Sequence, residues 1–219
     1  MSITSPIIPA IIPTSYEDLV LQVTKLRGLP EVHIDVIDGI FAPAASWPYH
    51  DQADVTVAYE LLAPFSLEVD LMAEKPIPAA HIWLKAGADQ LVFHVETISV
   101  EAFKQFAFEC PVSVGVACSN STPLQLLYQY LPFTDYVQCM GIATIGSQGQ
   151  PFDESVLERL KQIQIKFPKL PLSIDGSINE TTILLLKDLK LSRYIVGSAI
   201  MNAREPKEMY RILTALTKN

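Results

Sequence analysis

Apolar and polar positions follow one another along the chain in two alternating patterns. Short stretches rich in Val, Ile, Leu and Phe and bounded by Pro, Gly or Asp predict β-strands, whereas the stretches between them carry apolar residues at the three- and four-residue spacing of helices. The predicted strands are 5–12, 31–38, 65–73, 90–96, 111–118, 134–143, 171–176 and 193–198. The predicted helices are 15–28, 52–62, 77–87, 99–109, 123–131, 153–167, 179–189 and 206–217.

A regular alternation of strand and helix is typical of the α/β class. Because eight such units in this length match a closed parallel (β/α)8 barrel, the TIM-barrel architecture, we expect a single barrel domain over residues 1–219. An open doubly wound sheet is the alternative, but no Gly-x-Gly-x-x-Gly sequence follows an early strand. Active sites of such barrels lie at the carboxyl ends of the strands, so polar residues there are the candidates for chemistry.

The composition supports one large core and narrows the choice of partners. Hydrophobic residues make up 49% of the chain and charged residues 18%, and the formal net charge is −8 at pH 7. A negative protein repels phosphodiester backbones, which argues against nucleic acid, although backbone amides can still hold a small phosphorylated molecule. No apolar run is long enough to span a membrane, and the three cysteines lack metal-type spacing, so we expect reduced thiols in a cytoplasmic protein.

Two predicted strands run into an acidic residue and then a glycine, at Asp35 and at Asp175. A charge at the end of an apolar strand is costly for stability alone, so the pair suggests two acids on opposite sides of one pocket. Alternation along the strands places further polar side chains on the same inward faces, and the converging set is His33, Asp35, Asp70, His94 and Asp175. So many carboxylates in an interior of low dielectric require a positive partner, and a divalent metal ion is the simplest one.

Each of these residues also has a structural alternative. His33 could be a core histidine satisfied by a neighbour, although its spacing of two from the next acid directs both side chains at one centre. Asp70 could pair with Lys75 or Lys85 instead of binding a metal, and His94 could be an inward packing residue. The sequence leaves these alternatives open.

Three further residues near the strand ends are expected to shape the site. Asp38 is expected to be structural and to hydrogen bond the amides of the turn at Gly39. Met72 and Met140 are flexible wall residues in one interpretation and a cap over a substrate in the other. With His94 they form the predicted substrate pocket.

Glycines in the last three strand-to-helix loops predict a phosphate site. Such glycines let backbone N–H groups approach an anion closely, and this fold commonly binds phosphate near its seventh and eighth strands. The candidates are Gly146, Gly149, Gly176, Ser177, Gly197 and Ser198.

Five segments of the chain, in order and spacing, resemble the ribulose-phosphate 3-epimerase family. They are His33-Ile-Asp35-Val-Ile-Asp38-Gly39, Val69-Asp70-Leu71-Met72, Phe93-His94-Val95-Glu96, Asp175-Gly176-Ser177-Ile178 and Val196-Gly197-Ser198-Ala199-Ile200. The resemblance covers nearly the full length of the chain.

This resemblance implies a (β/α)8 barrel that interconverts ribulose 5-phosphate and xylulose 5-phosphate by moving the proton at carbon 3. It implies that Asp35 and Asp175 are the base and the acid, in roles that switch with direction. It also implies one divalent ion, Zn, Fe, Mn or Mg, held by His33, Asp35, Asp70 and Asp175, which stabilises the cis-enediolate. A small sugar phosphate is then the partner, and we expect a homo-oligomer.

The chain departs from the family pattern at several positions. Asp70 stands where the family has a metal-binding histidine, which favours harder ions such as Mg²⁺ or Mn²⁺ over Zn²⁺ or abolishes the site. Ala10 stands where the family has a serine, which removes a contact to a substrate hydroxyl group. Ile37 replaces a methionine, and the loop 144–150 is altered around Gly146 and Gly149.

Two other functions are compatible with such a barrel. Related decarboxylases and lyases use an Asp-x-Lys-x-x-Asp pattern on the third strand, but Met72 stands where the lysine is required. A barrel that binds phosphate without turnover is the remaining alternative, with Asp70 and Ala10 as the inactivating changes.

Overall fold

The computed structural model describes residues 5–146 and 149–218, and its central element is a closed barrel of parallel strands in the order β1 to β8. The strands are β1 Ile7–Ile11, β2 Glu31–Ile37, β3 Ser66–Met72, β4 Gln90–His94, β5 Ser113–Cys118, β6 Tyr136–Met140, β7 Leu172–Asp175 and β8 Arg193–Val196. Each lies within a predicted strand, and β8 pairs with β1 to close the barrel. The predicted (β/α)8 fold is confirmed, and the open sheet is wrong.

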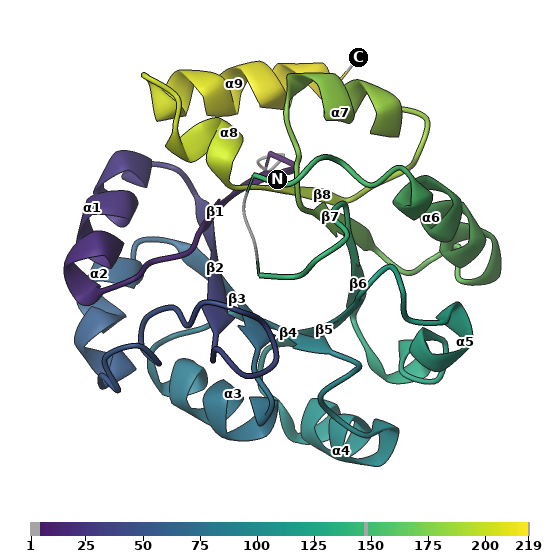
Figure 1. The fold of residues 1–219 in the computed structure, drawn as a ribbon, viewed down its shortest axis with the longest axis horizontal. Helices are drawn as coiled ribbons and strands as arrows, with labels where there is room; N and C mark the ends of the chain where they lie inside the picture. Colours follow the sequence, from purple (N-terminus) through teal and green to yellow (C-terminus); the bar gives the residue numbers. More distant parts are fainter. Residues whose placement is uncertain (1–4, 147–148, 219) are drawn as a thin grey trace.

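Helices surround the barrel as an outer ring (Figure 1). They are α1 Tyr16–Leu26, α2 Tyr59–Leu62, α3 Pro76–Lys85, α4 Val100–Glu109, α5 Leu124–Leu127, α6 Ser155–Lys166, α7 Glu180–Leu186, α8 Ser198–Met201 and α9 Pro206–Leu216. Short 3-10 helices cover Val55–Ala58 and Leu131–Phe133. Several helices begin at side-chain caps: Ser15 accepts from the Asp18 amide, and Ser99 accepts from the Ala102 amide.

Three segments differ from the predicted helices. The segment 52–62 forms a 3-10 turn followed by the short α2, because β-branched Val55, Thr56 and Val57 disfavour a longer α-helix. The segment 123–131 ends early as α5, and Pro132 continues the chain in a 3-10 turn. The four-residue helix α8 was not predicted, because it is too short for helical periodicity to register.

The inside of the barrel is polar at the level of the strand centres. The register of β2 against β3 places His33 beside Glu68 and Asp35 beside Asp70. The buried polar residues on the strands are His33, Asp35, Glu68, Asp70, His94, Gln138, Ser173 and Asp175. Since TIM barrels normally fill this space with branched apolar residues, so dense a polar interior indicates function.

Two further observations concern the expected setting of the protein. Within the described residues, no helix has the length and apolar character needed to cross a bilayer. Cys110, Cys118 and Cys139 are all free thiols. Burial raises the pKa of the Cys118 thiol to about 11, so this thiol is unreactive at neutral pH.

Candidate active site

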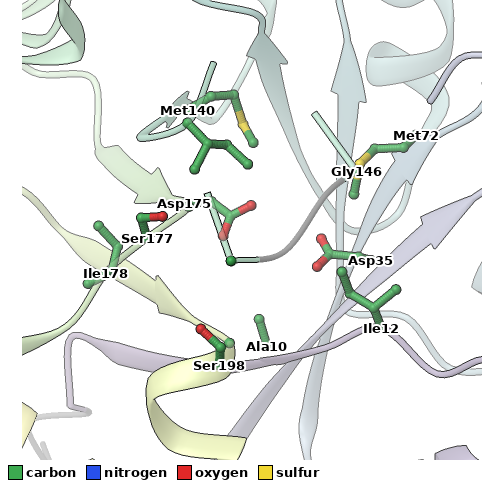
Figure 2. A pocket seen from close by; sticks show the side chains of 14 residues that line it. Ala10, Ile12, Asp35, Met72, Met140, Gly146, Asp175, Ser177, Ile178 and Ser198 are labelled. Carbon is green, nitrogen blue, oxygen red and sulfur yellow. The ribbon is translucent and has the colours of Figure 1, made fainter. Parts of the chain in front are cut away.

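A pocket opens where the strands end, and two carboxyl groups face it from opposite walls. Asp35 reaches it from β2, and Asp175 reaches it from the last position of β7. Figure 2 shows the two carboxyl groups directed toward the same space between these walls. The lining residues are Ala10, Ile12, Asp35, Met72, Met140, Ile142, Gly146, Gly149, Asp175, Gly176, Ser177, Ile178, Gly197 and Ser198.

Four of the predicted residues converge on one point. Ligand-type atoms of His33, Asp35, Asp70 and Asp175 all lie within 4.8 Å of one another. This is the spacing expected of groups that share one cation, and one imidazole nitrogen with three carboxylates suits a hard or borderline divalent ion such as Mg²⁺, Mn²⁺ or Fe²⁺. The donor set therefore fits a divalent metal.

The pKa values of Asp35 and Asp175 are both raised, and that of Asp175 is raised more. Burial raises the pKa of Asp175 well above its ordinary value, and the charge of Asp35 raises it further. Burial also raises the pKa of Asp35, but a hydrogen bond with His33 opposes the rise. Without a cation, Asp175 therefore retains a proton more readily than Asp35.

Asp70 is completely buried beneath the pocket, and its two oxygens have separate partners. His94 Nε2 lies 3.1 Å from Asp70 Oδ1, and Gln138 Nε2 donates to Asp70 Oδ2 over 2.8 Å. The alternative in which Asp70 pairs with Lys75 or Lys85 is therefore wrong. Asp70 shares its centre with the other three ligand-type residues, and its partners fix the direction of its carboxylate.

The structure places His94 behind the site, outside the residues that line the pocket. Its side chain is fully buried, and its ring lies 5.2 Å from the ring of Phe41 between centroids. Although burial alone would lower the pKa of His94, the charge of Asp70 raises it. Met72 and Met140 do line the pocket, and Figure 2 shows both thioethers on its upper side in that view.

A second set of polar side chains, linked by hydrogen bonds, lies on the side of His33 that faces away from the pocket. The sequence patterns assigned no role to it. His33 Nδ1 lies 2.7 Å from Glu68 Oε1, and Arg193 at the start of β8 hydrogen bonds to Glu68 Oε2. Although burial opposes it, the hydrogen bond from His33 and the charge of Arg193 lower the pKa of Glu68 to about 2. Two features of the sequence could have indicated this set: Glu68 faces inward in the apolar strand β3, and Arg193 is the first residue of β8.

All six predicted phosphate-site residues border the pocket, on the side formed by β6, β7 and β8. Three of them are glycines with a positive φ, namely Gly146 at +78°, Gly149 at +77° and Gly176 at +104°, and at Gly146 and Gly176 a Cβ would also approach Ala42 or Ile142 to under 3 Å. Ser177 also has a positive φ of 54°, and its hydroxyl group donates to the Gln150 carbonyl. The Gly176 amide interacts with Asp175, so Gly176 serves the acid as well as the loop.

Asp38 has the structural role that its position predicts. Its Oδ1 accepts hydrogen bonds from the amides of Ile40 and Phe41, and its Oδ2 accepts one from the Glu74 amide. These contacts fix the loop after β2 against the loop after β3. Asp38 therefore shapes the rim of the site and stays out of the acid cluster.

Comparison with known families gives a match over most of the chain. The model of the ribulose-phosphate 3 epimerase family matches residues 6–201. A ribulose-phosphate 3-epimerase of Aquifex aeolicus is 28% identical over 207 residues, which cover 90% of this chain and 88% of the relative. That of Candida glabrata is 24% identical over 220 residues, covering 93% and 89%. A relative from Oryza sativa, named as a cytoplasmic isoform, is also 24% identical and covers 97% of this chain and 93% of its own.

Solved structures share the fold with low sequence identity. The 3-keto-L-gulonate-6-phosphate decarboxylase of Vibrio cholerae superposes with a TM-score of 0.72 at 17% identity, covering 98% of both chains. The 3-hexulose-6-phosphate synthase of Salmonella typhimurium gives a TM-score of 0.70 at 16% identity, covering 97% of this chain and 98% of that one. At this level of identity the likeness establishes the barrel architecture alone.

Proposed function

We propose that this chain, which belongs to the ribulose-phosphate 3-epimerase family, interconverts ribulose 5-phosphate and xylulose 5-phosphate. The observation that carries the proposal is the placement of Asp35 and Asp175 on opposite walls of one pocket, with both carboxyl groups directed at the space between them. Inversion at a carbon next to a carbonyl group needs one base on one face and one acid on the other. This arrangement supplies both.

In the proposed reaction, the ionised member of the pair removes the proton from carbon 3 of the ketose. The protonated member then delivers a proton to the opposite face of the same carbon, which inverts its configuration. The raised pKa of Asp175 favours its role as the acid when Asp35 starts as the base. After one turnover the two protonation states are exchanged, so the enzyme is ready for the reverse reaction.

We propose that His33, Asp35, Asp70 and Asp175 hold one divalent cation. A cation at that point would stabilise the negative charge that develops on the oxygens of carbons 2 and 3 when the proton leaves. The support from this chain is the 4.8 Å grouping of the four ligand-type atoms. Three buried carboxylates beside only two imidazoles, His33 and His94, also favour further positive charge at this point.

The rest of the pocket fits a phosphorylated sugar. Ser177, Gly197 and Ser198 border one side of it, where backbone amides would bind the phosphate group. Met72, Met140 and Ile142 form an apolar wall that excludes water from the reacting carbon. Gly146 and Gly149 line the same pocket.

A decarboxylase or lyase function is less well supported by the same pocket. Such enzymes place an ammonium group beside the developing carbanion. The described lining residues include no lysine or arginine, and the uncharged thioether of Met72 occupies the third-strand position. The two proton transfers of epimerisation need only the two acids that the pocket contains.

The test follows the hydrogen at carbon 3. Ribulose 5-phosphate is incubated with the enzyme and Mn²⁺ in deuterium oxide, and NMR monitors both epimers. We expect deuterium to enter carbon 3 together with formation of xylulose 5-phosphate. If no label enters carbon 3 of either epimer, two-base proton transfer is wrong for this substrate.

We propose a reducing, cytoplasmic setting, which the three free thiols support. We also propose a homo-oligomer. Large apolar side chains on the outer surface support this proposal, since Phe108 is 92% exposed and Ile165 is 82% exposed. Light scattering of the purified protein tests it, and a monomer at micromolar concentration would contradict it.

A further inference from the structure

The side of His33 that faces away from the pocket ends on a charged network at the closed end of the barrel. His33 is fully buried, with Nε2 3.2 Å from Asp35 Oδ1 and Nδ1 2.7 Å from Glu68 Oε1. Glu68 is itself 1% exposed. The two ring nitrogens therefore have different tasks, and only Nε2 faces the acid cluster.

Glu68 is held in place from the opposite side of the barrel. Arg193 Nη1 donates to Glu68 Oε2 and, over 2.8 Å, to Gln90 Oε1, while Nη2 lies 3.3 Å from Glu31 Oε2. These partners lie on β2, β3 and β4, whereas Arg193 lies on β8. Three acceptors thus fix the guanidinium group of Arg193. Because Arg193 binds one oxygen of Glu68, the other oxygen is directed at His33.

We propose that Glu68, held by Arg193, is a positioning residue that keeps the His33 ring with Nδ1–H on Glu68 and Nε2 directed at Asp35, Asp70 and Asp175. A carboxylate has no hydrogen to donate, so the hydrogen between Glu68 and His33 belongs to Nδ1. Nε2 hydrogen bonds to Asp35 when no cation is bound, and it is the nitrogen that would give up its hydrogen and offer a lone pair to a cation. Where it concerns a metal, this inference rests on the proposed function.

The chemistry of the contact makes Glu68→Gln an informative variant. An amide of the same shape has one acceptor and one donor, but Glu68 accepts hydrogen bonds on both oxygens. Because Arg193 can only donate, the amide oxygen of the variant must face Arg193 and its NH2 group must face His33. His33 Nδ1 then has to accept, and the ring hydrogen moves to Nε2, where it points at the acid cluster.

The experiment compares the wild type with E68Q, R193M and the matched control S173A, all freed of metal with a chelator and then of the chelator. Ser173 is buried and pairs with Arg193 in the register of β7 and β8, and its hydroxyl group donates to the Val137 carbonyl. The first measurement is NMR of the histidine ring nitrogens in the metal-free proteins. The second is calorimetric titration with Mn²⁺.

We expect the wild type and S173A to show a hydrogen-bonded Nδ1–H on His33, and E68Q to lose it. We expect E68Q and R193M to bind Mn²⁺ about 10- to 100-fold more weakly than the wild type, and S173A to bind it unchanged. A wild-type His33 without a hydrogen on Nδ1 overturns the proposal, as does E68Q that keeps both this signal and wild-type Mn²⁺ affinity. If the wild type binds no Mn²⁺, the metal in the proposed function is wrong, while the Nδ1–H signal still decides the role of Glu68.

Discussion

His94 Nε2 lies 3.1 Å from Asp70 Oδ1 in a pair whose side chains are both fully buried. His94 contacts one oxygen of the Asp70 carboxylate and Gln138 donates to the other, and the two contacts together fix the direction of the carboxylate. The position where the family has a metal-binding histidine therefore holds an oriented oxygen donor. We propose that the substitution changes the type of ligand atom and keeps it at the centre of the group, since an Asp70 oxygen lies within 4.8 Å of the ligand-type atoms of His33, Asp35 and Asp175.

Asp70→His should shift the metal preference of the site. Replacing one of three carboxylates by a neutral nitrogen donor lowers the negative charge and favours Zn²⁺ over Mn²⁺ and Mg²⁺. Competition titrations of the metal-free proteins measure this preference. An unchanged order of affinities in a folded variant would show that Asp70 does not contact the ion.

Asp35→Asn and Asp175→Asn should each abolish epimerisation, with kcat lower by a factor of about 10² to 10⁴, because each removes one of the two proton-transfer groups. Each variant should still exchange the carbon 3 hydrogen of the one epimer whose hydrogen faces the remaining aspartate. NMR in deuterium oxide with each epimer separately detects this exchange. Exchange of the same epimer by both variants would mean that the two acids do not act on opposite faces.

Ala10→Ser should improve the use of a pentulose phosphate. Ala10 lines the pocket and lies beside His33 in the register of β1 and β2. A hydroxyl group there restores one hydrogen-bond partner for a substrate hydroxyl, a change of about 1 kcal/mol or roughly fivefold in kcat/KM. Steady-state kinetics measure it, with Ala199→Ser outside the pocket as the control. A lower kcat/KM would indicate a substrate that presents no hydroxyl group at this point.

Glu68→Gln should destabilise the protein least in acid. A pKa lowered to about 2 in the folded state means that ionised Glu68 stabilises the fold above its ordinary value of 4.5 and that this contribution is lost as the pH falls toward 2. The difference in unfolding free energy from the wild type, on the order of 3 kcal/mol at pH 7, should shrink as the pH approaches 3. Urea denaturation at several pH values measures it. S173A, which leaves the contacts of Glu68 with His33 and Arg193 in place, should show a difference from the wild type that does not change with pH.

The sequence predicts the barrel well because its signals are local. Each strand is an apolar run between turn residues. Alternation within one strand is enough to predict that the side chains of His33 and Asp35, and that of Asp175 in its own strand, face the inside of the barrel. The partners of Asp70 could not be predicted in the same way. Gln138 lies 68 residues further along the chain, and only the closure of the barrel brings the two together.

The short helices were mispredicted for a related reason. The segment 123–131 has helical spacing, but Pro132 and the hydrogen bond from the Tyr130 hydroxyl group to the Ile98 carbonyl together favour an early end of α5. In this segment the tertiary contact outweighs the local helix propensity. The role of Glu68 and Arg193 could not be predicted, because the role of a charged residue inside a strand depends on its partner. Here the two partners are 125 residues apart in the sequence.

The bond between Arg193 and Glu68 also bears on how the chain assembles. Arg193 belongs to the last strand, and the carboxylates that it neutralises belong to the second and third. A nascent chain that has formed only its first seven strands holds Glu68 with His33 but without the guanidinium of Arg193, and burying a carboxylate is less favourable when one of its two partners is missing. Partial barrels of this sequence are therefore penalised until the final strand arrives, so the molecule completes its folding as one cooperative closure and does not accumulate an open sheet.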